Sequence, residues 1–262
     1  MLTNLRRYAV SALIIVLALG FVGIEPAFSQ DGPTVKGKKR KAPPAAPKTT
    51  EKNDKGFAFG PDAMTHFILD VASKKNEVVF TSKAPKETIK GKAGAVKGEI
   101  DLNPRKLDAV TGSFAVEWKS IDTGNKGRNN HMLNKPWVDT GSHPEIIFTV
   151  TGMEMGKVAD KKGKTIKAKL VGKLAMNGKE KDTKIAVTLV YIEPPAGSKT
   201  GKEGIGIKTT FKVALADFGI EGKPGAVGNA VAEQPSIKVS IFLKRAEASD
   251  SKDGGNKMSF VK

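Results

Sequence analysis

The sequence predicts an all-β domain of seven to nine antiparallel strands, arranged as a sandwich or a barrel. Apolar and polar residues alternate with a period of two in several segments, and turn sequences separate these segments. Such alternation gives a strand one apolar face and one polar face. The composition agrees, because 28 of the 262 residues are glycine and only 6% are aromatic. That mix is typical of many short strands joined by tight turns.

The first 29 residues have the pattern of an export signal. Arg6 and Arg7 form a positive amino-terminal region, and residues 9–24 form an apolar run. The small residues in Ala27-Phe28-Ser29 match a cleavage site, which makes Gln30 the expected mature N-terminus. The expected location is therefore the periplasm. An uncleaved signal that anchors the chain in the inner membrane is the alternative, although the run is slightly short for a spanning helix.

Residues 30–60 read as a basic linker rich in lysine and proline, with almost no apolar side chains. Such a segment buries too little apolar surface to offset the entropy of ordering it, so we expect a disordered tether. Contact of its lysines with an anionic membrane surface is the alternative role. Residues 247–262 are polar and glycine-containing, and we expect a disordered tail. The folded domain is thus expected to span residues 61–246.

Within this domain, alternating segments follow one another with turn signals between them. The clearest hairpin turns are Asp160 to Gly163 and Asn177-Gly178, and Gly152 is a further expected break. A short turn of helix is expected within residues 129–137. The alternating apolar positions are Phe114, Val116 and Trp118; Ile146, Phe148 and Val150; Ile166, Ala168, Leu170 and Leu174; Ile185, Val187, Leu189 and Tyr191; Ile205, Ile207, Phe211 and Val213; and Ile237, Val239, Ile241 and Leu243.

The sequence gives little support for catalysis or metal binding. It contains no cysteine, which excludes thiol catalysis, disulfides and zinc–thiolate sites. A metal site built from His131 and His143 with Asp139 or Glu145 is one interpretation, but we favour loop-ordering histidines and expect no metal. No motif for a catalytic nucleophile is present, so no enzyme activity is expected. The enzymatic alternative would use His131, Asp139 or His143 as acid or base.

The formal net charge of +17 suggests either nucleic acid or an anionic membrane as a partner. The lysines are spread along most of the chain, which is more typical of solvated strand faces than of a phosphate-reading patch. The export signal also argues against nucleic acid, and we expect none to bind.

From about His66 to Lys244 the sequence resembles the YceI family, the bacterial lipocalin-like polyisoprenoid-binding proteins. The chain departs from the family pattern at Asn129-Asn130, Ala216 and Asn229, where the family usually has an acid, a polar residue and an aspartate. Four ordered blocks carry the resemblance: Ser120-Ile121-Asp122-Thr123-Gly124; Asn130 to Leu133 with Trp137-Val138-Asp139 and His143 to Phe148; Val171 to Gly178; and Ala216 to Ile220 with Val227 to Val231.

The resemblance implies an extended antiparallel lipocalin-like β-barrel of about eight strands that encloses an apolar tunnel. It implies storage or transport of an isoprenoid lipid, such as a quinone or its precursor, with no cofactor besides that lipid. The alternative is a structural or stress-response barrel with a filled core that acts through surface contacts. His131 and Asp217 are expected to order loops at the barrel mouth, and an edge strand could pair two barrels into a homodimer. The residues expected to line the ligand site are Phe80, Phe114, Val116, Trp118, Phe148, Val187, Leu189, Phe211, Phe218 and Ile241.

Overall fold

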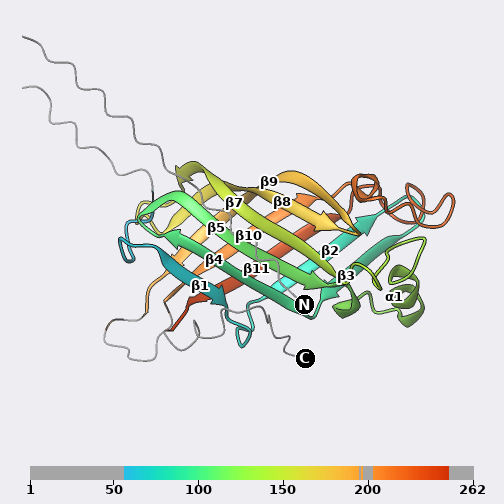
Figure 1. Ribbon diagram of the computed structural model, residues 1–262, viewed down its shortest axis with the longest axis horizontal. Coiled ribbons are helices and arrows are strands. Elements are labelled where there is room, and N and C mark those ends of the chain that lie inside the picture. Colours follow the sequence, from blue (N-terminus) through green and yellow to red (C-terminus); the bar gives the residue numbers. More distant parts are fainter. Residues whose placement is uncertain (1–55, 195, 197–202, 248–262) are drawn as a thin grey trace, which may run out of the picture. The chain divides into compact units, whose positions relative to one another are not determined.

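The computed structural model describes residues 56–194, 196 and 203–247 (Figure 1). The predicted signal peptide, residues 30–55 of the predicted linker and residues 248–262 of the predicted tail lie outside the described residues. No helix in the described ranges has the length and apolar composition needed to cross a membrane. The elements are β1 (Thr65–Leu69), β2 (Glu77–Lys83), β3 (Thr88–Ala93), β4 (Val96–Asn103), β5 (Lys106–Glu117), η1 (Trp118–Ser120), β6 (Ile121–Asp122), α1 (Lys126–Met132), β7 (Glu145–Val158), β8 (Thr165–Met176), β9 (Lys179–Ile192), β10 (Gly204–Lys212), η2 (Leu215–Phe218) and β11 (Ser236–Arg245).

Antiparallel pairing closes the sheet into a barrel. The order β1-β4-β5-β7-β8-β9-β10-β11 returns to its start because β11 also pairs with β1. Strand β2 pairs with the other part of β11, β3 pairs with β2, and β6 pairs with β3. Going around the barrel from β11, the series β2, β3, β6 thus follows the same order as the series β1, β4, β5. The two series lie one beyond the other along the barrel axis and share three strand positions. The result is a closed all-β barrel of eight strand positions, which confirms the predicted fold class.

The loop between β1 and β2 shows how two short strands occupy one position of the barrel. The Asp70 N–H donates to the Phe242 carbonyl at 3.0 Å, and the Phe242 N–H donates to Asn76 Oδ1 at 2.8 Å. The loop is thus fixed to β11 at both of its ends. Strand β11 continues past it without interruption and pairs with β1 on one side of the loop and with β2 on the other.

The predicted Asn177-Gly178 hairpin is confirmed. The two residues have φ angles of 51° and 77° and join β8 to β9, whose register is continuous from Met176↔Lys179 to Thr165↔Val190. A two-residue turn with positive φ at both positions matches the twist of the strands that it connects. Inside this hairpin the predicted alternation also holds, since every second residue of β8 from Ile166 to Met176 is buried.

Two sequence predictions need correction. Gly152 does not end a strand, because β7 runs through it, and the register with β8 shifts between Val150 and Gly152. An isolated glycine inside an alternating run is also the signal for a β-bulge, which is what the structure contains. The predicted helical turn begins earlier than residue 129. Asn125 caps α1, and its side-chain oxygen accepts a hydrogen bond from the Arg128 N–H at 3.0 Å.

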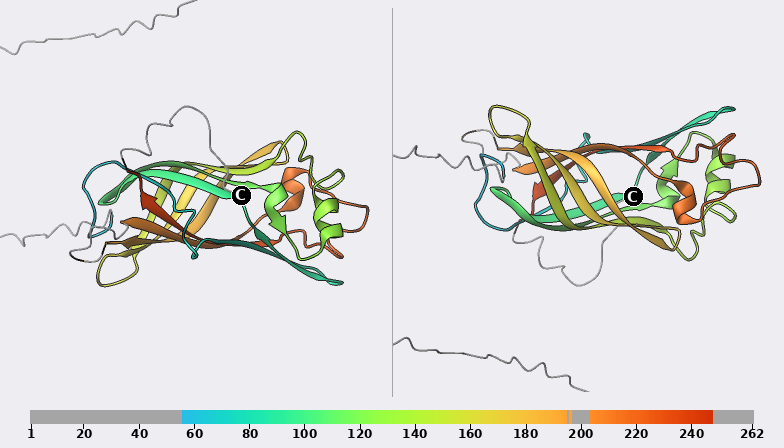
Figure 2. Two further views of the ribbon diagram at one scale, coloured as in Figure 1. Left: turned by 90° about the horizontal axis from the view of Figure 1, so that it is seen from below. Right: turned by 90° about the horizontal axis from the view of Figure 1, so that it is seen from above.

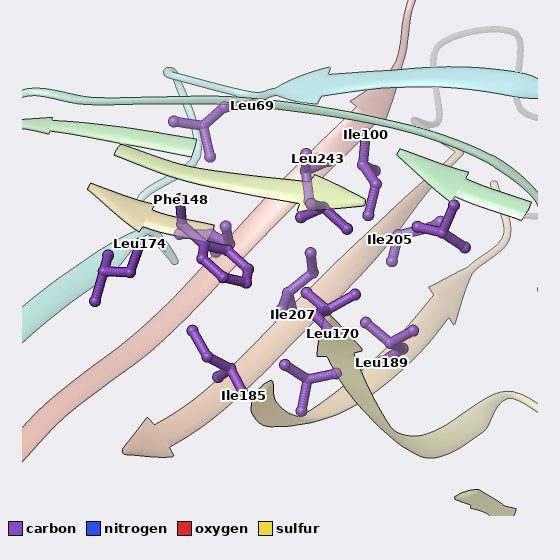
Figure 3. Close-up of a cluster of buried hydrophobic side chains, with 14 of the residues drawn as sticks. Leu69, Ile100, Phe148, Leu170, Leu174, Ile185, Leu189, Ile205, Ile207 and Leu243 are labelled. Carbon is purple, nitrogen blue, oxygen red and sulfur yellow. The ribbon is translucent and has the colours of Figure 1, made fainter. Parts of the chain in front are cut away.

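One half of the barrel interior is filled with side chains that are 0% exposed, and we call this group the plug. Within the plug, Phe67 of β1 lies directly opposite Ile100 of β4, and Ile205 of β10 lies directly opposite Leu243 of β11. Figure 3 shows Ile100, Leu189, Ile205 and Leu243 grouped on one side of the close-up, with Phe148, Leu174 and Ile185 on the other. The plug consists of Phe67, Ile100, Leu102, Leu107, Ile166, Leu189, Ile205 and Leu243.

Both ends of the described domain lie beside the plug. The Phe57 N–H donates to the Pro104 carbonyl at 2.7 Å, and the Ala246 N–H donates to the His66 carbonyl at 3.0 Å. The opposite end of the barrel carries α1, η2, the tip of the β2–β3 hairpin and the loop that leads to β11 (Figure 2). We call this opposite end the mouth.

Candidate functional site

The half of the barrel next to the mouth encloses a cavity of about 630 Å³. This volume falls within the roughly 300–1,000 Å³ of typical small-molecule sites. All strands except β1 contribute lining residues, as do α1, η1 and η2. The floor, where the cavity meets the plug, is formed by Leu170, Ile207 and Ile241. The sequence left open whether the interior is a tunnel or a filled core, and the structure has a filled half and a hollow half.

Most of the predicted ligand contacts line this cavity, and two do not. Leu189 belongs to the plug, and Phe218 is buried in η2 without lining the cavity. His131 lines the cavity near the mouth, whereas Asp217 is exposed on η2. The roles of all these residues in binding or loop ordering stay predictions. The predicted residues that line the cavity are Phe80, Phe114, Val116, Trp118, Phe148, Val187, Phe211 and Ile241.

Two phenylalanines lie over glycines of the neighbouring strand, and this arrangement keeps the cavity open. Phe80 pairs with Gly91 across β2 and β3, and Phe114 pairs with Gly98 across β5 and β4. A Cβ on Gly91 would lie 2.2 Å from Phe80 Cε1, and a Cβ on Gly98 would lie 2.4 Å from Phe114 Cδ1. The two rings therefore occupy the space that a side chain would need at these glycines. They cover the wall instead of filling the lumen.

The ionisable side chains that line the cavity are at the mouth. Arg128 on α1 donates a hydrogen bond through Nη2 to Glu87 at the tip of the β2–β3 hairpin. His131 and Lys223 complete the set. Deeper in the barrel the lining is almost entirely apolar, so the cavity has a polar entrance and an apolar interior.

The hairpin tip is also tied to the loop that precedes β11. The Lys86 N–H donates to the Asn229 carbonyl at 2.9 Å, and the Ala232 N–H donates to Ser82 Oγ at 2.8 Å. Together with the Glu87–Arg128 ion pair, these contacts join three segments that are distant in the sequence around the entrance.

Asp122 orders the chain where it enters α1. Its carboxylate accepts hydrogen bonds from the Gly124 N–H at 2.9 Å and from Asn129 Nδ2 at 2.8 Å. The Asn129 side chain, followed by the Gly124 backbone, lowers the pKa of the Asp122 carboxyl. The sequence block around Ser120-Ile121-Asp122 thus has a structural role at the mouth.

Asp139, a residue of the enzymatic alternative, has a similar environment. Its carboxylate forms an ion pair with Lys135 Nζ at 3.0 Å and accepts a hydrogen bond from the Ser142 N–H at 3.3 Å. These contacts, led by the Lys135 side chain, lower the pKa of the Asp139 carboxyl. In the described ranges, no three His, Cys, Asp or Glu side chains gather in a way that could hold a metal ion.

One buried donor stands out in the cavity wall. Trp118 is 6% exposed, its side chain lines the cavity, and its Nε1 is buried without a hydrogen-bond partner. Sequence alternation identified Trp118 as an inward-facing residue. It gave no sign of the unpaired N–H, because that depends on which groups surround the indole in space.

Comparisons with known proteins agree with this architecture. A protein of Vibrio vulnificus, UPF0312 protein VVA0736, is 28% identical over 157 residues, which cover 59% of this chain and 77% of that protein. The crystal structure of Burkholderia cenocepacia BcnA superposes with a TM-score of 0.53 at 18% identity, over 66% of this chain and 98% of that one. The second structural relative is described as a polyisoprenoid binding domain from Saccharophagus degradans implicated in plant cell wall breakdown. It has a TM-score of 0.51 at 11% identity and covers 70% of this chain and 100% of that one.

The two structural likenesses support the fold, and the sequence itself supports the family. Residues 69–243 match the YceI-like domain, a range that runs from the last residue of β1 almost to the end of β11. The resemblance seen in the four sequence blocks is therefore confirmed, and the chain belongs to the YceI-like domain family.

Proposed function

We propose that this protein binds an apolar isoprenoid lipid in the barrel cavity, and that it stores or carries the lipid without changing it chemically. The observation that carries the proposal is the apolar cavity of about 630 Å³ that remains in a barrel whose other half is densely filled. The description of the Saccharophagus degradans relative as a polyisoprenoid binding domain supports the same ligand class.

Burial of hydrocarbon is sufficient to bind such a ligand. Each buried methylene contributes about 0.8 kcal/mol, and micromolar affinity corresponds to about 8 kcal/mol. A few five-carbon isoprene units therefore reach this range without any charged contact. Specificity for chain length is expected to be loose, because an apolar pocket discriminates weakly between ligands that differ by single carbons.

The rival proposal is a structural barrel that acts through its surface and has no ligand. It predicts an interior filled by large side chains throughout. The plug meets that description, but the half of the barrel near the mouth does not, since Phe80 and Phe114 lie over glycines at the wall. The hollow half therefore favours ligand binding over the structural role.

The proposal includes export to the periplasm. Its support is the amino-terminal sequence, with the paired Arg6 and Arg7 followed by an apolar run and a cleavage-like site before Gln30. Cell fractionation with amino-terminal sequencing of the mature protein tests this part separately from lipid binding.

The test of lipid binding compares two substitutions that are one residue apart on β9. Val187 lines the cavity, whereas the neighbouring Thr188 does not. Each exported protein is purified without detergent, denatured, extracted with organic solvent and analysed by mass spectrometry. We expect wild type and Thr188→Trp to carry a stoichiometric isoprenoid, and Val187→Trp to carry little, because its indole occupies the cavity. A wild-type protein that stays empty even after incubation with isoprenoid quinones would contradict the proposal.

A further inference from the structure

The fold gathers onto one side of the barrel lysines that look evenly spread along the sequence. Strands β8 to β11 follow one another around the barrel, and they contain eleven lysine or arginine residues but only two acidic residues. Strands β7, β5, β4 and β1 complete the ring, and they contain three lysines and six acidic residues. One half of the ring is therefore strongly basic and the other half slightly acidic. We call the outer surface of β8 to β11 the basic face; these strands run from yellow to red in Figure 1.

The register of the strands places two unpaired lysines in one row of the basic face. Lys167 of β8 and Lys208 of β10 both lie directly opposite Thr188 of β9. Lys167 is exposed between the buried Ile166 and Ala168, so its side chain faces solvent, and Lys208 is exposed as well. In the part of the chain that the structure describes, neither lysine forms an ion pair. Their charges are therefore available to a partner outside the barrel.

Acidic side chains offset the positive charge only at the borders of the basic face. Its own two acids, Glu180 and Asp182, both lie beside Lys173 near the β8–β9 turn. At the edge that faces β7, Glu154 forms ion pairs with lysines of β8 and β9. At the edge that faces β2, Glu77 forms an ion pair with a lysine of β11. The centre of the face thus keeps its positive charge.

We infer that the basic face docks the barrel on the surface of an anionic lipid bilayer. Positive charge spread over four strands fits a broad anionic surface better than a nucleic acid, whose footprint is a stripe or a groove. Ten of the eleven basic residues are lysines, which act as point charges, and only one is an arginine, the residue suited to bidentate phosphate recognition. Because the strands run from the plug to the mouth, the docked barrel lies on its side.

The inference goes beyond the proposed function, because the distribution of charge does not depend on what the cavity holds. The basic linker, residues 30–60, is a second positive segment that can contact a membrane. A test must therefore separate the basic face from the linker, and two pairs of exposed lysines allow this. One pair is Lys167 and Lys208. The other is Lys106 at the start of β5 and Lys119 in η1, which follows β5 in the acidic half of the ring.

The full exported chain is sedimented with isoprenoid-free vesicles of phosphatidylglycerol and phosphatidylcholine. We expect Lys167→Gln with Lys208→Gln to weaken vesicle binding about thirtyfold, because each lysine at an anionic surface contributes about fivefold. Lys106→Gln with Lys119→Gln removes the same charge and should change the affinity less than about twofold, since solvent ions screen charges on the far side of the barrel. Wild type should not bind to vesicles of pure phosphatidylcholine.

Equal vesicle affinities of the two double variants would attribute the contact to the linker and overturn the inference. A loss of affinity for a DNA duplex, with vesicle binding unchanged, would attribute the basic face to nucleic acid and overturn it as well. Lipid extraction and mass spectrometry of the Lys167→Gln, Lys208→Gln variant should still find the isoprenoid of the wild-type protein. Docking and isoprenoid binding are thus tested separately, and either can fail without the other.

A second measurement reports which side of the barrel touches the membrane. The chain contains no cysteine, so one introduced thiol gives a unique labelling site. Thr188→Cys places a fluorescent label in the centre of the basic face, and Thr111→Cys places it on β5 in the acidic half. With nitroxide-labelled headgroups in the anionic vesicles, we expect much stronger quenching at position 188 than at position 111. Equal quenching at both positions would show a barrel with no preferred side and would overturn the inference.

Discussion

Two glycine–phenylalanine pairs hold aromatic rings against the wall of the barrel cavity. Gly98 and Gly91 have no side chains, so the rings of Phe114 and Phe80 can lie across their backbones at the wall. A larger residue at either glycine would meet a ring atom at a distance that real Cβ atoms do not show. The ring would then have to move toward the lumen, and the cavity would shrink.

Gly98→Ala is therefore expected to weaken isoprenoid binding, by about tenfold if the displaced ring removes room for one or two methylenes. The matched control is Gly152→Ala on β7, because a Cβ at that position would meet no atom within 4 Å. Titration calorimetry with one isoprenol measures both. Equal affinities for the two variants would contradict this account of the wall.

The contrast between Val187 and Leu189 marks the limit of what the sequence predicts at this scale. Both residues are apolar, both face inward on β9, and alternation predicts the same environment for each. The structure places Val187 in the cavity wall and Leu189 in the plug. How deep a residue lies in the barrel depends on the register of its strand with the neighbouring strands. Alternation within one strand predicts only which residues face inward.

Leu189→Ala is expected to lower the free energy of unfolding by about 2–5 kcal/mol, which is the usual cost of a leucine-sized void in a packed core. Leu189 is 0% exposed and distant from the entrance, so the affinity for ligand should change little. Urea unfolding and ligand titration on the same preparation measure the two effects. A large loss of affinity with little loss of stability would place Leu189 in the binding site after all.

At the scale of elements, α1 and the β2–β3 hairpin meet at the entrance through side chains from distant parts of the sequence. The sequence predicted a helical turn near α1, and the structure shows that this turn begins at Lys126. It could not predict the partner, because the Glu87–Arg128 pair depends on how the barrel closes. The bulge at Gly152 was missed for a different reason: one glycine signals either a turn or a bulge, and only the pairing with β8 decides between them.

Because the Glu87–Arg128 ion pair links two elements across the entrance, its removal should speed ligand exchange. Exposed ion pairs contribute roughly 0.2–1 kcal/mol, so Glu87→Gln is expected to raise the release rate about two- to fivefold. Stopped-flow transfer of a fluorescent isoprenoid to vesicles measures this rate. The control is Lys164→Met, which breaks a different ion pair, Lys164–Glu193. Lys164 immediately follows the β7–β8 turn, and neither of the two residues lines the cavity. Similar acceleration in both variants would argue against a role of the entrance pair in exchange.

At the scale of the whole molecule, several turns are held by carboxylates whose pKa is lowered in the fold. Asn129 lowers the pKa of Asp122, Lys135 that of Asp139, and the Thr165 side chain that of Asp160, each from an ordinary value of 3.8. A lowered folded-state pKa stabilises the protein above the unfolded value, and this stability is lost as the pH falls through the folded value.

The melting temperature is therefore expected to be nearly constant from neutral pH down to about pH 5 and to fall below about pH 4. Thermal unfolding followed by circular dichroism across this range tests it. The melting temperature of Asp122→Asn should fall less in acid than that of wild type, because the asparagine side chain has no carboxylate to be protonated. A decrease that begins between pH 7 and 6 would contradict this account.

Alternation and turns are local signals, and they located β5 and β7 to β11 in the sequence. They left a sandwich and a barrel equally open, and the resemblance carried by the four family blocks implied the barrel. The division of the interior into a filled half and a hollow half was not predictable. It arises from the register of all strands together and from the two glycines beneath the phenylalanine rings. Periplasmic location, contact of the basic linker with a membrane surface and a homodimer stay predictions.

The plug has a consequence for the proposed loading and release of a ligand. The plug is a hydrophobic core built from the chain's own side chains, so we expect the barrel to fold without a guest. A ligand that binds only the folded state adds RT ln(1 + [L]/Kd), about 2.7 kcal/mol at a hundredfold excess over Kd. Release removes only that increment and leaves the plug intact. We therefore expect the barrel to survive repeated loss and uptake of its proposed ligand, whereas a protein that folds around its cofactor unfolds when the cofactor leaves.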